Sequence, residues 1–395
     1  MSDWREMTLA DISSDISYGY TESAKSEKIG PKFLRITDIA NGRLNWDTVP
    51  YCPISVEDFV KYKLSPGDIV VARTGATTGA NYIIKNNDPT EAVFASYLIR
   101  YRIDQSYADP NFIGQVLRSI TWQDYVDSIA GGSAQPGANA KQLGSFPILL
   151  PPIPEQCAIA AVLSSLDNKI DLLHRQNKTL EAMAETLFRQ WFVEEADEGW
   201  EEGKVLDYCT HHKVGVKPQD FPTKSYSHYS IPAFDNNMNP IIENGSEIQS
   251  NKYTVIPNCL LFSKLNPNKD KRIWLILNQL NESSVCSTEF QVVLPNSRKY
   301  LFFLYAWLSI PRNYNEIASG VGGTSGSHQR IDPADIFNFP CPHIDDSYIE
   351  SFNVAAEPIF MKMSNNRIQI QTLEKLRDTL LPKLMSGEVR VEVTG

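Results

Sequence analysis

The chain carries the same long amphipathic segment twice, almost two hundred residues apart. Seven of nineteen positions are identical when residues 169–187 are laid over residues 362–380. Matches at similar offsets run through the rest of both halves, as in Trp4 with Trp200, Pro66 with Pro257 and Phe146 with Phe337. A repeat of this length indicates that a whole folding unit is duplicated. We therefore expect two related modules, each followed by a long helix.

Each half has the pattern of a mixed module that ends in a helix. Residues 68–73 and 97–103 are rich in β-branched and aromatic side chains, which is typical of strands, and 259–264 and 287–294 match them in the second half. Asp109–Pro110 is a helix-start pattern for a helix running toward Ile129, and a second helical stretch covers 300–318.

These elements predict an α+β fold with an internal pseudo-two-fold repeat. The expected parts are two similar globular domains, separated by two long helices that form an antiparallel coiled coil. The predicted boundaries are 1–150 for the first domain, 151–195 for the central helix, 196–345 for the second domain and 346–395 for the distal helix.

Apolar residues recur every three or four positions along both long segments, which indicates a seam for helix pairing. We expect the first helix to run from about Glu155 to Phe192, and the regular part of the second to be 359–381, between Pro358 and Pro382. The expected seam residues are Leu163, Leu166, Ile170, Leu173, Asn177, Leu180 and Leu187 with Ile359, Met363, Asn366, Ile370, Leu373 and Leu380.

The two asparagines in this seam select one antiparallel register. A pairing whose residue numbers sum to 543 sets Asn177 against Asn366 and Leu163 against Leu380. It gives each buried amide a partner, whereas a heptad shift leaves both unpaired at a cost of about 1–3 kcal/mol each. The alternative is that each helix packs on its own globular domain and each asparagine contacts water.

Composition excludes several other classes of protein. No run of eighteen apolar residues is present, so no membrane helix and no membrane partner are expected. The six cysteines are scattered without a CxxC pair, which favours reduced thiols in the cytoplasm, and the "CTHH" stretch at 209–212 lacks the second half of a metal site. Although the net charge is −10, acidic residues are concentrated at 194–202, so a DNA surface elsewhere is allowed.

Several stretches resemble the specificity subunit of type I restriction–modification systems along essentially the full chain. They are "ARTGATTG" (72–79), "GSAQPGANAKQL" (132–143), "FPILLPPIPEQCAIAAVLSSLDNKID" (146–171), "TLEAMAETLFRQWF" (179–192) and "TLEKLRDTLLPKLMSGEV" (372–389). The second module departs from this pattern, because "FSKLNPNKDKR" replaces the "ARTGATTG" loop.

The resemblance implies two target-recognition domains, each reading half of a split asymmetric site on double-stranded DNA. It also implies that the helices bind methylation (M) subunits, two of them expected, and that restriction/motor (R) subunits join the assembly. S-adenosylmethionine, ATP and Mg would be held by those partners, while this chain would bind no cofactor and catalyse nothing. The sequence agrees, because it has neither a GxxxxGK[ST] phosphate loop nor a methyltransferase motif.

Loops rich in Gly, Thr, Asn, Gln and basic residues are the candidate DNA contacts, since short polar and cationic groups suit phosphates and base edges. The candidates of the first module are Arg73, Thr74, Thr77, Thr78, Gln135, Asn139 and Lys141. Those of the second module are Lys264, Asn266, Lys269, Lys271, Arg272, Ser327, His328, Gln329 and Arg330. For any single residue, a loop role without DNA contact is an equal alternative.

Two other functions fit less well. A repeat scaffold that joins two protein partners without touching DNA is compatible with the acidic balance and the amphipathic helices. An enzyme would need a cluster of acids, a metal site or a nucleophile with its base, and the sequence shows no such arrangement.

Overall fold

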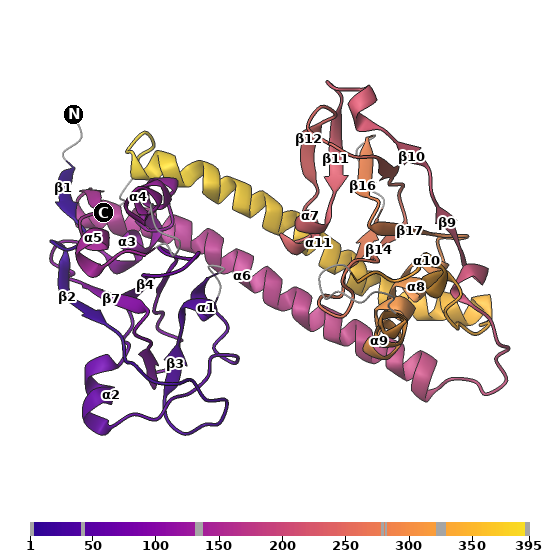
Figure 1. Cartoon of the computed structure of the whole chain (residues 1–395), viewed down its shortest axis with the longest axis horizontal. Coiled ribbons are helices and arrows are strands. Elements are labelled where there is room, and N and C mark those ends of the chain that lie inside the picture. Colours follow the sequence, from indigo (N-terminus) through magenta and orange to yellow (C-terminus); the bar gives the residue numbers. More distant parts are fainter. Residues whose placement is uncertain are drawn as a thin grey trace. The chain divides into compact units, whose positions relative to one another are not determined.

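The computed structural model describes residues 4–40, 44–130, 137–277, 280, 283–320 and 329–391. It has two compact units: Met1–Lys169 with Leu373–Gly395, and Ile170–Thr372. Two long helices, α6 (Ile153–Arg189) and α11 (Asp346–Met385), contribute to both units and are the long magenta and yellow ribbons of Figure 1. Strand β8 ends at Leu150 and α11 begins at Asp346, whereas the two compact units divide within the long helices.

The first unit is built around a four-stranded antiparallel sheet with the order β2–β7–β4–β5. Every residue of the central strand β4 is buried, as its run of β-branched side chains predicts. The strands are β1 (Arg5–Thr8), β2 (Ser13–Tyr18), β3 (Lys32–Leu34), β4 (Asp68–Ala72), β5 (Asn81–Ile83), β6 (Ala92–Phe94), β7 (Leu98–Ile103) and β8 (Pro147–Leu150). The helices are α1 (Ile36–Ile39), α2 (Val56–Tyr62), α3 (Pro110–Val116), α4 (Ile120–Ala130) and α5 (Ala140–Gly144).

The second unit repeats this sheet as β9–β17–β14–β15 and adds a five-stranded sheet with the order β10–β13–β16–β11–β12. The strands are β9 (Cys209–His212), β10 (Gly215–Val216), β11 (Ser225–Tyr229), β12 (Ile241–Asn244), β13 (Lys252–Thr254), β14 (Cys259–Ser263), β15 (Ile273–Ile276), β16 (Ser284–Ser287) and β17 (Phe290–Pro295). The helices are α7 (Ile231–Asp235), α8 (Tyr300–Ser309), α9 (Pro311–Ser319) and α10 (Pro333–Phe337), with the 3₁₀ turns Val205–Asp207 and Pro218–Asp220. The matching strand order shows the duplication directly.

Three predicted elements are interrupted in the structure. Asp109 caps its helix as expected, accepting a hydrogen bond from the Phe112 amide at 2.8 Å, but that helix ends at Val116 and α4 follows. The expected strand 287–294 is two strands, β16 and β17, and the stretch 300–318 is two helices, α8 and α9. In the last case Pro311 begins a new helix because it lacks the N–H that would continue the previous one.

The prediction that α11 is regular only over 359–381 is wrong, because the helix is continuous through both prolines. Pro358 is exposed, so water can satisfy the carbonyl that loses its N–H partner there. Phe352, Ala356 and Phe360 are buried on the other side of the same helix turns. Their packing holds the helix together across a residue that would otherwise break it.

The two long helices pack in opposite directions within each unit. In the first unit Leu163 near the start of α6 joins a core with Leu381 and Leu384 at the end of α11. In the second unit Phe188 near the end of α6 joins a core with Phe352 near the start of α11. The antiparallel pairing is therefore confirmed.

The asparagine register is also confirmed. In the second unit the Asn366 amide nitrogen donates to Asn177 Oδ1 at 2.9 Å, and the Asn177 amide nitrogen donates to the Met363 carbonyl at 3.4 Å. Asn366 is fully buried. Its burial is tolerated because a polar partner from the facing helix meets it there.

All thirteen predicted seam residues are buried or half-buried. Leu163, Ile170, Leu173, Met363, Asn366 and Ile370 are buried, and the other seven are half-buried. The structure adds Phe188 and Phe360, which are more deeply buried than their neighbours Leu187 and Ile359. Strict heptad spacing missed these two, because globular side chains widen the apolar face of each helix.

Replacing Asn366 with leucine is expected to lower the free energy of unfolding by about 1–3 kcal/mol, because Asn177 loses its buried partner. The double variant Asn177→Leu, Asn366→Leu should recover most of that loss, since neither polar group then remains in the seam. Denaturant unfolding of the four proteins of this cycle measures the coupling. Asn365→Leu on the exposed face is the control, and equal losses in the Asn366 single and double variants would contradict the pairing.

Candidate nucleic-acid interface

Three loop segments of the first unit meet at the end of strand β4. Directly after this strand, the Arg73 amide donates to the Tyr97 carbonyl at 3.1 Å, and the Arg73 carbonyl accepts from the Ala138 amide at 2.9 Å. Thr74 and Gly137 form a further β-bridge. The backbone of Arg73 is thus held from both sides by segments that are distant in sequence.

The Arg73 side chain lies over an exposed tyrosine. Its guanidinium carbon is 5.0 Å from the centroid of the Tyr18 ring, and the Tyr18 hydroxyl accepts a hydrogen bond from the Ala140 amide at 3.1 Å. Cation–π contact restricts the guanidinium without using its N–H groups as donors, although Nε itself is buried. Tyr18 and Tyr97 are 43% and 56% exposed. Sequence reasoning missed both, because tyrosines at strand ends are equally typical of a half-buried sheet.

The other candidates of the first module play different parts. Thr78 is 8% exposed and its hydroxyl donates to the Gly75 carbonyl at 2.7 Å, so it stabilises the loop from inside. Asn139 caps α5 by accepting from the Gln142 amide at 2.9 Å, and its side chain remains exposed beside Lys141. Thr74 and Thr77 are half-buried, and Gln135 lies outside the described residues.

The second module repeats the arrangement around Lys264, which directly follows strand β14. The Lys264 amide donates to the Glu289 carbonyl at 2.9 Å, and the Lys264 carbonyl accepts from the Ile331 amide at 3.0 Å. Leu265 and Arg330 form the corresponding β-bridge. Arg73 and Lys264 therefore occupy the same position in the two repeats, although only one of the two loops matches the family pattern.

Arg330 and Glu289 form an ion pair at this second loop junction. Arg330 Nε lies 3.0 Å from Glu289 Oε2, and Arg330 Nη2 lies 2.9 Å from Oε1. The hydrogen bonds that Arg330 donates to the Glu289 carboxylate raise the pKa of Arg330. Beside this pair the Asn266 amide donates to the Gln329 carbonyl at 2.8 Å. Ser327 and His328 lie outside the described residues.

Arg272 and Lys271 are directed elsewhere. The Arg272 side chain is 9% exposed and binds Asp235 at 2.7 Å and Asp270 at 2.8 Å. Its hydrogen bonds to Asp235 are the main reason why the pKa of Arg272 is raised. Both carboxylates occupy the guanidinium, so Arg272 is a structural residue and its assignment as a DNA contact is withdrawn.

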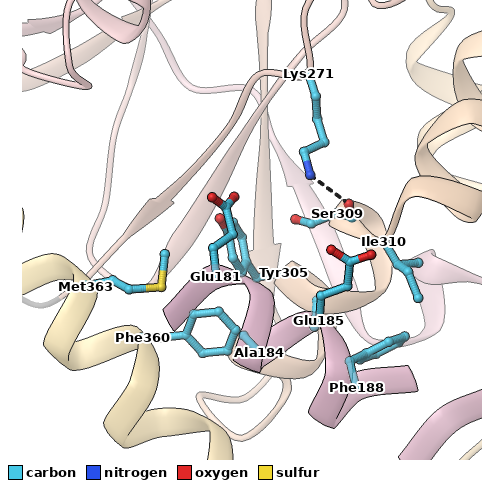
Figure 2. Close-up of a pocket in the computed structure, with 11 residues that line it drawn as sticks. Glu181, Ala184, Glu185, Phe188, Lys271, Tyr305, Ser309, Ile310, Phe360 and Met363 are labelled. Carbon is cyan, nitrogen blue, oxygen red and sulfur yellow. Dashed lines mark hydrogen bonds between the residues drawn. The ribbon is translucent and has the colours of Figure 1, made fainter. Parts of the chain in front are cut away.

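Lys271 lies at a small pocket beside the helices and not at the loop junction. Its amine donates to the Ser309 carbonyl at 3.0 Å, and Figure 2 shows it on the pocket side that carries the carboxylates of Glu181 and Glu185. These surroundings favour a structural role for Lys271 within the second module. Lys269, in contrast, is exposed next to Asn266.

The described residues offer little chemistry for catalysis or metal binding. Burial lowers the pKa of His211 to about 4, with nearby Lys213 adding to the effect, so this histidine is neutral at pH 7. Within the described part of the chain, no three His, Cys, Asp or Glu residues are grouped to hold a metal ion. None of the helices in these described residues is both long and apolar enough to cross a membrane.

Comparison with known proteins agrees with the duplicated α+β fold. Residues 1–182 match the family described as "Type I restriction modification DNA specificity domain". The MjaIX specificity subunit of Methanocaldococcus jannaschii is 26% identical over 359 residues, which cover 82% of this chain and 76% of the relative. The HindI specificity subunit of Haemophilus influenzae is 28% identical over 200 residues, covering 49% of this chain and 42% of the relative.

A solved structure extends the likeness to the whole fold. The S subunit of the type I restriction–modification system from M. genitalium has a TM-score of 0.62 at 12% identity, covering 97% of this chain and 96% of that one. This solved structure shares the arrangement of paired modules and long helices, and the family that residues 1–182 match is a DNA specificity domain. In sequence and in fold, the chain is similar to the specificity subunits of type I restriction–modification systems.

Proposed function

We propose that each module reads one half of a split DNA site with the three loop segments that meet beyond its central strand. The observation that carries this proposal is the equivalent backbone position of Arg73 and Lys264. The amide of each residue donates to the turn that precedes the neighbouring strand of the sheet, β7 or β17. The carbonyl of each accepts a hydrogen bond from a later loop. In a DNA specificity protein, two such rigid cationic positions at repeated sites suit two separate contacts with DNA.

The residue types at these junctions divide into two roles. Lys141, Lys264 and Lys269 can neutralise phosphates and set the position of the module on the duplex. Arg73 can donate two hydrogen bonds to guanine O6 and N7, while Asn139 and Gln329 can address adenine. Arg73 is suited to base reading because its guanidinium lies over the Tyr18 ring and forms no ion pair with the residues that the structure describes.

We further propose that the chain is the non-catalytic member of a cytoplasmic assembly. Two methylation subunits would dock on α6 and α11, and restriction subunits would join them. S-adenosylmethionine, ATP and Mg would be held by these partners. The names of the relatives, which are specificity subunits of restriction enzymes, support an assembly of this kind.

Replacing Arg73 with alanine should weaken binding of target DNA by about tenfold or more, the typical effect of losing one bidentate base contact. The complete chain is assembled with its methylation subunits. The measurement is the Kd of this complex for a duplex that carries its target sequence, over a range of salt concentrations. Arg5→Ala is a matched control, because Arg5 also lies over a tyrosine ring, that of Tyr107, but on strand β1. Equal affinities of wild type and Arg73→Ala at every salt concentration would remove Arg73 from the interface.

The same assay tests the function as a whole. A repeat scaffold that joins two protein partners would bind the methylation subunits and show no sequence-dependent affinity for duplex DNA. Specific binding should exceed binding to unrelated duplex by at least about a thousandfold for a DNA reader.

A further inference from the structure

The Glu289–Arg330 pair belongs to the second module alone, although the backbone that carries it is shared by both modules. The positions equivalent to Glu289 and Arg330 in the first module are Tyr97 and Gly137, which make the same backbone contacts. The shared fold therefore does not require the ion pair. Its two side chains are 23% and 45% exposed, and an exposed ion pair contributes little to stability.

From this placement we infer that Glu289 and Arg330 together read a single G·C base pair in the half-site of the second module. This inference rests on the proposed function and deepens it, because it assigns a base pair to two named residues. Both stand at the junction where Lys264 is fixed.

The geometry of the pair leaves one edge of the guanidinium free. Glu289 takes the side formed by Nε and Nη2 of Arg330, at 3.0 and 2.9 Å. The other edge, formed by Nη1 and the second hydrogen of Nη2, still carries two parallel N–H donors. Guanine presents two neighbouring acceptors, O6 and N7, in the major groove, and paired donors of this kind match them.

The carboxylate supplies the third element of the match. Each carboxylate oxygen can accept more than one hydrogen bond, so Glu289 retains acceptor capacity while it binds Arg330. The cytosine opposite guanine presents its N4 amino group as a donor in the same groove. Two donors beside an acceptor therefore complement the edge of a G·C pair. An A·T pair presents an acceptor, a donor, an acceptor and a methyl group, which does not match.

The backbone around the pair fixes both side chains at their roots. Arg330 lies in the β-bridge to Leu265, and the Glu289 amide donates to Ser287 Oγ at 3.3 Å while its carbonyl binds Lys264. A charged pair anchored in this way is pre-organised, so little freedom is lost when it meets a base pair.

The test uses Glu289→Gln and Arg330→Lys in the complete chain assembled with its methylation subunits. Each complex selects from a duplex library randomised across both half-sites, and the selected sequences are read. Glu289→Gln keeps the shape of the side chain, and Arg330→Lys keeps the charge but loses the paired donors. We expect each variant to lose about 10- to 100-fold of its preference for G·C at one and the same position of one half-site.

The matched control is Glu357→Gln, which alters the exposed Arg298–Glu357 ion pair of the same unit and should leave every preference unchanged. Thermal unfolding of each complex verifies that the variants are folded. A uniform loss of affinity for all sequences, or an unchanged motif in both variants, would overturn the assignment while leaving the proposed function intact. A wild-type complex that selects no motif would overturn the proposed function itself.

Discussion

The variant Phe192→Ala is expected to lower the free energy of unfolding by about 3–5 kcal/mol, the usual cost of removing a buried phenylalanine ring. Phe192 is 4% exposed and lies in the π-helical turn Gln190–Glu194 that follows α6. Its ring centroid is 4.8 Å from Phe188, 4.9 Å from Phe352 and 5.1 Å from Phe303. One alanine would therefore open a cavity where α6, α11 and α8 of the second unit meet.

Val193→Ala is the control for this prediction, because Val193 is the next residue and its side chain is 45% exposed. It should change the free energy of unfolding by less than about 0.5 kcal/mol. Denaturant unfolding, followed by tryptophan fluorescence, measures both variants. Similar small losses for the two would mean that the aromatic cluster repacks around the missing ring.

The aromatic cluster around Phe192 also explains why tryptophan recurs in the repeat, as Trp4 and Trp200. Trp200, which matches Trp4 in the repeat, has its ring centroid 6.3 Å from that of Phe192. In the first unit the Trp4 ring lies against Gly387, where an added Cβ would be 3.3 Å from it, and beneath Arg390. Each tryptophan therefore packs beside the residues that follow the end of a long helix, within its own unit.

The long helices were predictable because periodicity alone specifies them. Apolar residues such as Leu163 and Leu173 in α6, and Ile370 in α11, follow the spacing of a buried helix face. Each face also holds one asparagine, and only one register pairs the two. The structure contains the pair that this reasoning predicted, Asn177 with Asn366. Local apolar spacing also found β4 and β14, since a buried central strand is a short continuous apolar run.

The candidate site was less predictable, because its residues are defined by contacts between distant segments. The loop composition pointed to Arg73 and Lys264, but it could not show that Tyr18 supports the arginine. It also gave Arg272 the same standing as Arg330. Both arginines bind a distant carboxylate, but Arg272 is 9% exposed and bound by both Asp235 and Asp270, whereas Arg330 is 45% exposed and bound by Glu289 alone.

Replacing Arg102 with methionine should lower the free energy of unfolding by about 3–5 kcal/mol, because it leaves a buried carboxylate without its counter-charge. Asp68 on β4 faces Arg102 on β7, and the guanidinium binds both carboxylate oxygens, at 2.8 and 3.0 Å. The Asp68 side chain is 2% exposed. After the change the Asp68 carboxylate still accepts a hydrogen bond from the Ser65 amide, which is too little to compensate a buried charge.

Arg175→Met provides the matched comparison, since Arg175 and Asp171 form an ion pair on the exposed face of α6. Losing this exposed ion pair should lower the free energy of unfolding by less than about 1 kcal/mol. Combining Arg102→Met with Asp68→Asn should restore most of the stability, because a neutral amide is far less costly to bury than a carboxylate. Equal losses for Arg102→Met and Arg175→Met, with no rescue in the double variant, would show that the Asp68 charge is solvated in the folded protein. Strand β4 leads directly into Arg73, so the rescued variant should also bind DNA with the affinity of the wild type.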